Sequence, residues 1–365
     1  MRQNTFCISA PKTNSAGLAV CSGVASLVII KAMLRIGLPQ NISEEFLQGF
    51  PGDNVEIIRL PDHLDHEVDV EFWIPSMFGS QAARVFPHLR GVKVVQCLRA
   101  GVDWILPWLP QGIILCDGQG LHNIPVAEWV VAAILGSLKR FPEYRDHQRE
   151  QFWGGQARPQ GAAEHGSGGH HASNDSAPDG RQYSYRILGD ELHKKKVLIV
   201  GYGGIGTEVE RLLQVFHVDI VRVARTAKPG VSAIGDLAKL LPEADVAVLL
   251  VPLTEQTRGL MNAEMLGRMK AGALLVNAAR GTIVDTNALL AQLQARRIHA
   301  VLDVMDPEPL PKEHPLWTAP NCFITPHVAG SVVGFATRGL EFAAEQVRRY
   351  MAGEPLENRV GDAGY

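Results

Sequence analysis

A glycine-rich turn between an apolar run and an amphipathic segment constrains the fold of this chain more than any other feature. Residues 196–200, Lys-Val-Leu-Ile-Val, form a short β-branched run that is typical of a buried parallel strand. The turn Gly-Tyr-Gly-Gly-Ile-Gly at 201–206 follows it, and residues 207–216 have helical spacing. Because glycines allow a tight turn and close approach of the backbone to a pyrophosphate, this order predicts a dinucleotide site. Its candidate binding residues are Gly201, Tyr202, Gly203, Gly204, Ile205 and Gly206.

Short apolar runs recur along the rest of the chain, separated by polar, periodic or Pro/Gly-bearing stretches. Residues 126–139 carry apolar side chains at helical spacing. This alternation predicts an α/β fold with two Rossmann-like, doubly wound domains built on parallel sheets. The expected strands lie at 26–30, 55–60, 68–74, 92–98, 218–223, 246–251, 273–277, 299–302 and 322–325.

Composition excludes several function classes. The chain has 365 residues, 46% of them hydrophobic, so it is long enough for two domains with cores of their own. A formal net charge of −3 predicts neither nucleic-acid nor membrane binding, and small metabolites are the expected partners. The five cysteines are scattered and show no metal-ligand spacing, so we expect reduced cytosolic thiols and no metal. They are Cys7, Cys21, Cys97, Cys116 and Cys322.

Two stretches are expected to lie outside the packed domains. Residues 1–43 contain no Asp or Glu, which resembles an organellar targeting segment. The apolar run at 18–30 is interrupted by Ser and Gly, so a loose extension over residues 1–25 of a cytoplasmic protein is favoured instead. Residues 154–179 are rich in Gly, Ser, Ala and His, which predicts a flexible loop rather than a metal site. The histidines of that loop are His165, His170 and His171.

The end of the strand at 218–223 indicates which dinucleotide would bind. An NAD site places Asp or Glu about twenty residues after the glycines. Here Arg225, Thr226 and Lys228 stand in that region, and no acid does. Two cations and a hydroxyl suit a ribose phosphate better than a neutral diol, so NADP(H) is favoured and NAD(H) stays possible. In the alternative interpretation, Arg225 stacks on the adenine and Lys228 is a solvated turn residue.

An ordered series of motifs resembles the D-2-hydroxyacid dehydrogenases from about residue 92 to residue 360. The series includes Arg-Ala-Gly-Val-Asp at 99–103, Val-Ala-Glu at 126–128, the glycine turn, Ala-Asp-Val at 244–246 and Pro-Leu-Thr at 252–254. It continues with Asn-Ala-Ala-Arg-Gly at 277–281, Leu-Asp-Val at 302–304, Pro-Glu-Pro-Leu at 307–310, His-Pro-Leu-Trp at 314–317 and Thr-Pro-His-Val-Ala-Gly at 325–330.

The resemblance implies a catalytic set of Arg280, Glu308 and His327. Reduction of a 2-oxo acid needs a proton donor, and imidazole changes charge near neutral pH, so His327 is the expected general acid. Glu308 would orient its ring. Arg280 would bind the substrate carboxylate and polarise the carbonyl oxygen through its planar fork. In the alternative interpretation, His327 is structural, Glu308 caps a turn and Arg280 pairs with Asp285.

The resemblance also implies further binding residues. Backbone amides near Ala100 and Gly101 would bind the substrate carboxylate, and Asp303 would hold the nicotinamide carboxamide. Arg99 departs from the family pattern, where a small or polar residue is more usual, and it either selects an extra anionic or hydroxyl group or points to solvent. The remaining expected cofactor contacts are Val251, Pro252, Thr257, Ala278, Arg280 and His327.

The resemblance further implies how the domains are divided. A substrate domain of residues 26–122 plus 326–365 would face a cofactor domain of residues 123–325 across an active-site cleft. The helix at 126–139 would form the arm of a homodimer. The expected activity is reduction of a small 2-oxo acid by NADPH, with glyoxylate or hydroxypyruvate as substrate. The alternatives are an NAD-dependent phosphoglycerate-type dehydrogenase and a dinucleotide-sensing, corepressor-like binding protein.

Overall fold

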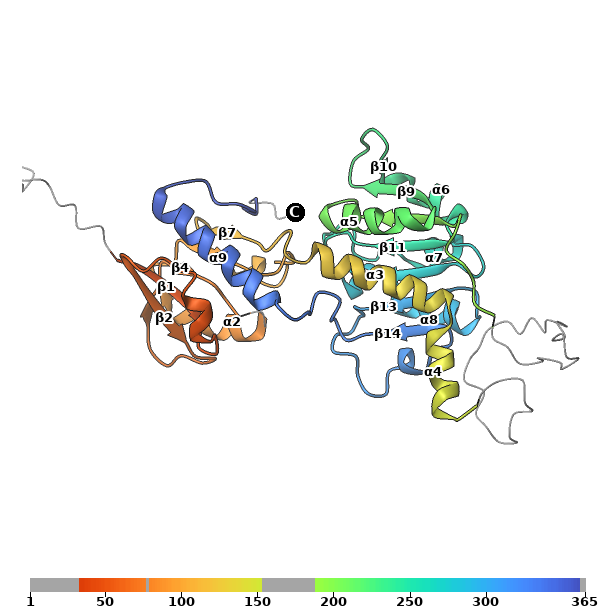
Figure 1. Ribbon diagram of the computed structural model, residues 1–365, viewed down its shortest axis with the longest axis horizontal. Coiled ribbons are helices and arrows are strands. Elements are labelled where there is room, and N and C mark those ends of the chain that lie inside the picture. The colour runs from red at the N-terminus through yellow and green to blue at the C-terminus, as the bar shows by residue number, and fades with distance from the viewer. Residues whose placement is uncertain (1–32, 77–78, 153–187, 362–365) are drawn as a thin grey trace, which may run out of the picture. The chain divides into compact units, whose positions relative to one another are not determined.

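Seven parallel strands form the sheet that carries the glycine turn (Figure 1). In chain order they are β8 (Lys196–Val200), β9 (Asp219–Ala224), β10 (Ser232–Ala233), β11 (Val246–Leu249), β12 (Leu274–Asn277), β13 (His299–Leu302) and β14 (Cys322–Ile324). Their order across the sheet is β10-β9-β8-β11-β12-β13-β14. The chain therefore enters the sheet at β8, adds β9 and β10 on one side, and then adds β11 to β14 on the other side. Open α/β sheets bind ligands at such a switch point, which here lies between β8 and β11. This computed structural model describes residues 33–76, 79–152 and 188–361.

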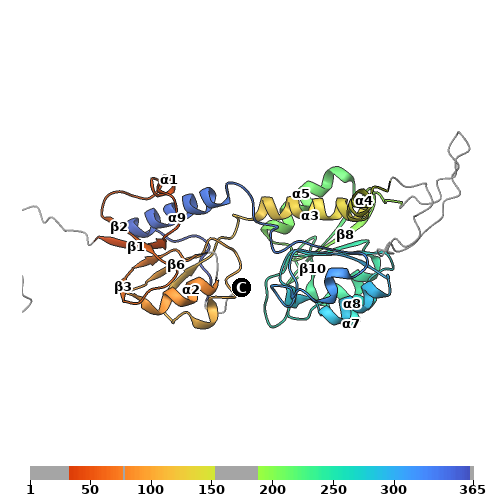
Figure 2. The same cartoon turned by 90° about the horizontal axis from the view of Figure 1, so that it is seen from below.

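Helices cover both faces of this sheet because side chains alternate along each strand. Val197 and Ile199 point toward α3 (Asn123–Leu138) and α5 (Gly204–Leu213), whereas Leu198 and Val200 pack in the core of the other face. That other face carries α6 (Leu237–Leu240), α7 (Ala263–Arg268) and α8 (Thr286–Gln294), as Figure 2 shows for the last two.

A second sheet has five parallel strands in the order β2-β1-β4-β6-β7. They are β1 (Leu34–Pro39), β2 (Val55–Leu60), β4 (Phe72–Trp73), β6 (Val94–Gln96) and β7 (Ile114–Cys116). The C-terminal helix α9 (Phe335–Ala352) packs on one face, near α1 (Glu44–Leu47), and α2 (Gly79–Val85) packs on the other. The chain thus returns to this sheet after completing the seven-stranded one.

Smaller elements complete the described fold. A two-stranded sheet joins β3 (Val68–Asp69) to β5 (Leu89–Arg90), and α4 (Phe141–Arg149) follows α3. Short 3-10 turns lie at Phe86–His88, Leu106–Trp108, Gln214–Phe216, Ile234–Asp236, Leu241–Glu243, Gly281–Ile283 and Pro315–Thr318.

Several expected elements differ from the observed ones. The strand expected at 26–30 and the extension at 1–25 lie outside the described residues. Strand β1 was not predicted because an arginine and a glycine interrupt its apolar side chains. The strand expected at 68–74 is two short strands in different sheets. The helix expected at 207–216 begins at Gly204 and ends in a 3-10 turn. The helix expected at 126–139 is α3, which spans Asn123–Leu138. Arg140, with a left-handed φ of 58°, precedes α4, which tolerates Pro142 in its first turn.

The described residues include neither a membrane span nor a metal cluster. Over residues 33–76, 79–152 and 188–361, no helix has the length and apolar character needed to cross a bilayer. Within the same ranges, no three His, Cys, Asp or Glu side chains gather as a metal site. The loop expected at 154–179, with His165, His170 and His171, falls outside them. Cys97, Cys116 and Cys322 are free thiols.

Candidate active site

The predicted site residues follow the carboxyl ends of parallel strands. Within the seven-stranded sheet, Gly201 follows β8, Arg225 follows β9, and residues 251–257 follow β11. Residues 278–280 follow β12, residues 303–308 follow β13, and His327 follows β14. All these strands are parallel to their neighbours, so their carboxyl ends lie at the same edge of the sheet.

The backbone of the glycine turn packs closely against its neighbours at every glycine except Gly203. Gly201 has a φ of 109°, and a Cβ there would lie 2.5 Å from the Leu250 carbonyl carbon. A Cβ at Gly206 would lie 2.7 Å from the carbonyl oxygen of Gly201. At Gly203, by contrast, a Cβ would meet no heavy atom within 4 Å. The turn therefore leaves open space at the N-terminus of α5, where backbone N–H groups favour an anion.

Two further contacts shape this turn. The side chain of Asn123, the first residue of α3, lies against it: a Cβ at Gly204 would be 2.5 Å from the Asn123 side-chain nitrogen Nδ2. Asn123 was not predicted from the sequence, because no local motif marks it. Arg222 lies over the Tyr202 ring at 5.7 Å and also pairs with Glu210, so Tyr202 packs against β9 and α5.

The loop after β9 presents the residues expected to distinguish NADP from NAD. Arg225, Thr226 and Lys228 are all exposed. The backbones of Lys228 and Val231 exchange two hydrogen bonds of 2.9 Å, which close a tight turn around Pro229 and Gly230. No acid occurs between Ala224 and Val231. The loop is therefore compatible with an anion and lacks the carboxylate that would bind a ribose diol.

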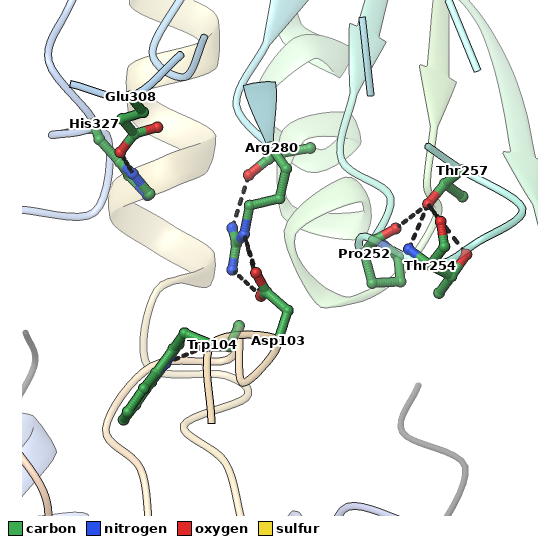
Figure 3. Close-up of polar contacts among 10 residues, drawn as sticks. Asp103, Trp104, Pro252, Thr254, Thr257, Arg280, Glu308 and His327 are labelled. Carbon is green, nitrogen blue, oxygen red and sulfur yellow. Dashed lines mark hydrogen bonds and ion pairs between the residues drawn. The ribbon is translucent and has the colours of Figure 1, made fainter. Parts of the chain in front are cut away.

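Hydrogen bonds of the Thr257 side chain stabilise the loop after β11. The Thr257 hydroxyl donates to the Pro252 carbonyl oxygen at 2.6 Å and accepts from the Thr254 backbone N–H at 2.8 Å (Figure 3). Val251 is buried, and the Ala278 backbone N–H donates to the Leu249 carbonyl at 3.3 Å. Thr257 thus shapes the loop expected to line the cofactor.

His327 and Glu308 form a hydrogen-bonded pair. The His327 Nδ1 atom lies 2.6 Å from the Glu308 Oε1 atom, and both side chains are partly exposed (Figure 3). This contact leaves Nε2 as the other ring nitrogen. The two residues come from the loops after β14 and β13, so tertiary structure brings them together.

The loop that carries His327 is fastened to buried Asp303. One Asp303 oxygen accepts from the Thr325 hydroxyl at 2.5 Å and from the Val328 N–H at 2.8 Å, and the other accepts from the Ala329 N–H at 2.9 Å. The Asp303 carbonyl also accepts from the His327 N–H at 2.7 Å. His327 has a left-handed φ of 54°, a conformation that needs such support. Asp303, expected to contact nicotinamide, is only 2% exposed.

Arg280 pairs with Asp103 and not with Asp285. Its Nη2 and Nε atoms lie 2.9 and 3.3 Å from Asp103 Oδ1, and its Nη1 donates to the Ala279 carbonyl at 2.8 Å (Figure 3). Asp285 instead caps α8 by accepting from the Ala288 N–H. The alternative pairing considered from the sequence is therefore wrong. The guanidinium also lies against Gly101, where a Cβ would overlap it.

Aromatic side chains support the loop that contains Gly101 and Asp103. The Trp104 indole N–H donates to the Gly101 carbonyl at 3.1 Å, and the Trp108 indole N–H donates to the Trp104 carbonyl at 2.9 Å. The two rings pack with their centroids 6.1 Å apart. The contact of Asp103 with Arg280 was not predicted, although Asp103 lies in the motif at 99–103.

Arg99 and His122 add charge-sensitive groups to this region. Burial lowers the pKa of the half-buried Arg99 guanidinium, and the positive charge of Arg280 lowers it further. Burial lowers the pKa of His122 to about 4, with further lowering by Arg99, Arg338 and His327. The His122 ring contacts Gly330 and packs on Phe335 with centroids 4.3 Å apart. No sequence motif singled out His122.

Comparisons with known proteins identify the class. The family described as D-isomer specific 2-hydroxyacid dehydrogenase, NAD binding domain, matches residues 131–329. Glyoxylate/hydroxypyruvate reductase B from Enterobacter agglomerans is 32% identical, over 77% of this chain and 77% of the relative. D-3-phosphoglycerate dehydrogenase from Methanocaldococcus jannaschii is 29% identical, over 77% of this chain and 50% of the relative.

A solved structure agrees in fold. The D-isomer specific 2-hydroxyacid dehydrogenase from Xanthobacter autotrophicus Py2, in complex with NADPH and MES, has a TM-score of 0.67 and 28% identity and covers 91% of this chain and 99% of that one. The chain belongs to the D-isomer specific 2-hydroxyacid dehydrogenase family. Members of this family are NAD(P)-dependent oxidoreductases.

Proposed function

We propose that this chain reduces small 2-oxo acids to D-2-hydroxy acids with NADPH, and that glyoxylate and hydroxypyruvate are the first substrates to test. The observation that carries the proposal is the placement of Arg280 and the His327–Glu308 pair. All three follow carboxyl ends of strands in the sheet that carries the glycine turn. A carboxylate anchor and a proton donor are therefore supplied from the edge at which a dinucleotide would bind.

The glycine turn fits a dinucleotide. The open space at Gly203 and the α5 N-terminus would accept a diphosphate, with Gly201 and Gly206 keeping the backbone close. Arg225, Thr226 and Lys228 would bind a ribose phosphate, which supports NADP(H) over NAD(H). The relative from Xanthobacter autotrophicus was solved with NADPH. A bound reduced nicotinamide would supply the hydride.

The chain's own residues would provide the remaining chemistry. Arg280 has five N–H groups and uses three of them on Asp103 and Ala279, which leaves two for the substrate carboxylate and carbonyl oxygen. Backbone amides at Ala100 and Gly101 would bind the other carboxylate oxygen. His327 would donate a proton from Nε2 to the carbonyl oxygen, and Glu308 would hold its ring and balance its charge.

The division into domains is part of the same proposal. We assign residues 26–122 plus 326–365 to substrate binding and residues 123–325 to the cofactor, in line with the two sheets and with the packing of α9 on the five-stranded one. A homodimer built on α3 is proposed from the resemblance, and analytical ultracentrifugation tests it. A monomer at micromolar concentration would contradict it.

The direct test is loss of absorbance at the reduced-nicotinamide band with glyoxylate, hydroxypyruvate, pyruvate and phenylpyruvate. Turnover should be faster with NADPH than with NADH, and His327→Ala should abolish it. Replacing both Arg225 and Lys228 by Ala should lower kcat/KM for NADPH about tenfold or more and spare NADH. Glu308→Gln should change the pH profile of kcat. Tight NADPH binding without turnover of any acid would contradict the proposal and favour a dinucleotide-sensing binding protein.

A phosphoglycerate-type dehydrogenase is the second candidate. The relative from Methanocaldococcus jannaschii carries that name, and Arg99 adds a cation to the substrate region. Oxidation of D-3-phosphoglycerate with NAD at a higher kcat/KM than reduction of glyoxylate with NADPH would favour it.

A further inference from the structure

Arg280 contacts the loop that contains Gly101, Arg99 begins that loop, and Arg338 lies in the helix that follows the His327 loop. Arg280 is paired with Asp103, and His327 is paired with Glu308. Among the residues that the structure describes, neither Arg99 nor Arg338 forms an ion pair with a carboxylate. Two positive charges are thus left without an acidic partner beside the catalytic residues.

Arg99 lies next to the substrate loop. It immediately precedes Ala100 and Gly101, and the Arg280 guanidinium lies against Gly101. The charges of Arg280 and Glu308 both act on the Arg99 guanidinium, which is half-buried. Burying a cation without an acidic partner is unfavourable, and an anionic ligand would relieve that cost.

Arg338 belongs to the helix that packs on His122. The His122 ring contacts Gly330 in the loop after His327 and packs at a tilt on Phe335, the first residue of α9. Arg338 lies in the first turn of the same helix. A Cβ at Gly334, which precedes Phe335, would lie 3.8 Å from Arg338 Nη1, so this guanidinium lies at the start of α9. The positive charges of Arg99 and Arg338 both lower the pKa of the His122 ring.

The cofactor does not account for these charges. A ribose phosphate is expected in the loop with Arg225, which follows β9 of the seven-stranded sheet, whereas Arg99 follows β6 of the five-stranded sheet. A diphosphate is expected at the α5 N-terminus. The carboxylate of a 2-oxo acid would take Arg280. We therefore assign an additional anion at Arg99 to the substrate.

We propose that Arg99 and Arg338 bind a second anionic group of the substrate, so that 2-oxo acids with a further carboxylate or phosphate are preferred over glyoxylate. This inference rests on the proposed function and specifies its substrate class. An arginine fork binds either group through two parallel hydrogen bonds. The neutral His122 ring would line the same region without adding charge.

The test compares substrates at fixed NADPH. Glyoxylate and hydroxypyruvate lack a second charge, oxaloacetate and 2-oxoglutarate carry a second carboxylate, and 3-phosphohydroxypyruvate carries a phosphate. We expect kcat/KM to be about tenfold or more higher for at least one doubly charged acid than for glyoxylate, as a charge-assisted hydrogen bond would give. Whichever acid leads identifies the group as carboxylate or phosphate.

Variants connect the preference to the two arginines. Arg99→Gln and Arg338→Met should each lower the ratio of kcat/KM for the doubly charged acid to that for glyoxylate, by about tenfold. Arg338 is exposed, so its replacement is not expected to disturb folding. Arg348→Met, on the same helix, is the matched control and should leave the ratio unchanged.

The outcomes separate the two proposals. Turnover of glyoxylate without preference for any doubly charged acid, or an unchanged ratio in both variants, would overturn this inference and leave the reductase proposal standing. No turnover of any 2-oxo acid would overturn the reductase proposal itself, and this inference with it.

Discussion

The Arg280 guanidinium lies 2.9 Å from the Asp103 carboxylate and so joins the loop after β12 to the loop after β6, across 177 residues of sequence. The same guanidinium donates to the Ala279 carbonyl. Arg280 is therefore held on two sides by its own chain, and its remaining N–H groups have a defined direction. Such preorganisation favours binding of a planar carboxylate.

Asp103→Asn tests whether this ion pair positions Arg280. The amide keeps the shape but loses the charge, so the guanidinium should be held less firmly. We expect the KM for the 2-oxo acid to rise about tenfold, with little change in the Kd of NADPH. Steady-state kinetics and a fluorescence titration of NADPH measure the two quantities. An unchanged KM would show that Asp103 does not position Arg280.

Gly101→Ala tests the close contact between the substrate loop and Arg280. The added methyl group would overlap the guanidinium, which must then move. A displacement of about 1 Å can cost about 100-fold in rate, so kcat/KM should fall by about that factor. The free energy of unfolding should change little, because the far end of a side chain can shift.

A matched glycine substitution provides the control for Gly101→Ala. Gly267 lies in α7, and a Cβ there would meet no heavy atom within 4 Å. Gly267→Ala should keep wild-type kcat/KM and raise stability by about 0.5–1 kcal/mol. Equal kinetics for the Gly101 and Gly267 variants would contradict the proposed crowding of Arg280.

Six strands of the seven-stranded sheet were predicted because each is a largely apolar run between polar segments, whereas the two-residue strand β10 was not. Strand β1 was missed, although Leu34, Ile36 and Leu38 alternate and are all buried, because Arg35 and Gly37 interrupt the run of apolar residues. Strand β7, with three residues, was too short for its pattern to stand out. Local periodicity thus identifies buried strands reliably only when they are long and uninterrupted.

The site was predictable only where a local motif marks it. His327, Glu308 and Arg280 each stand in a recognisable context, and the structure joins the first two. The contact of Arg280 with Asp103, and the placement of His122 against Gly330, depend on the packing of distant segments. No spacing within the sequence encodes them, so they required the structure.

Asp303→Asn tests whether the buried carboxylate positions His327. The amide nitrogen of Asn would face a backbone N–H of Val328 or Ala329 and could not accept its hydrogen bond. Stability should fall by about 1.5–3 kcal/mol, and kcat should fall about 100-fold even where the variant is fully folded. Chemical unfolding and kinetics well below the Tm provide the readouts.

Thr325→Val is the matched control for Asp303→Asn. It removes one donor to Asp303 and leaves the carboxylate and both backbone contacts. We expect a smaller loss of kcat and unchanged affinity for NADPH. If Asp303→Asn weakens NADPH binding but not kcat, the carboxylate serves the cofactor rather than His327.

His299→Asn tests a pH-dependent contribution to stability outside the active site. Burial lowers the pKa of His299 to about 4, with a further contribution from Arg140, whose Nη1 atom lies 3.2 Å from His299 Nδ1. In the unfolded chain the pKa is about 6.5. Between these values the unfolded chain binds a proton that the native chain does not, so stability is lost as pH falls from about 6.5 to about 4.

The pH dependence of the His299→Asn variant should be flatter than that of the wild type. The Asn amide oxygen can still accept from Arg140 but does not titrate, so the slope of unfolding free energy should fall by up to about 1.4 kcal/mol per pH unit. His122 contributes with the same sign, and Asp117, whose pKa burial raises to about 6, contributes with the opposite sign. Both are present in both proteins, so the difference between the two curves isolates His299. Parallel curves from denaturant titrations between pH 4.5 and pH 7 would show that His299 is protonated alike in both states.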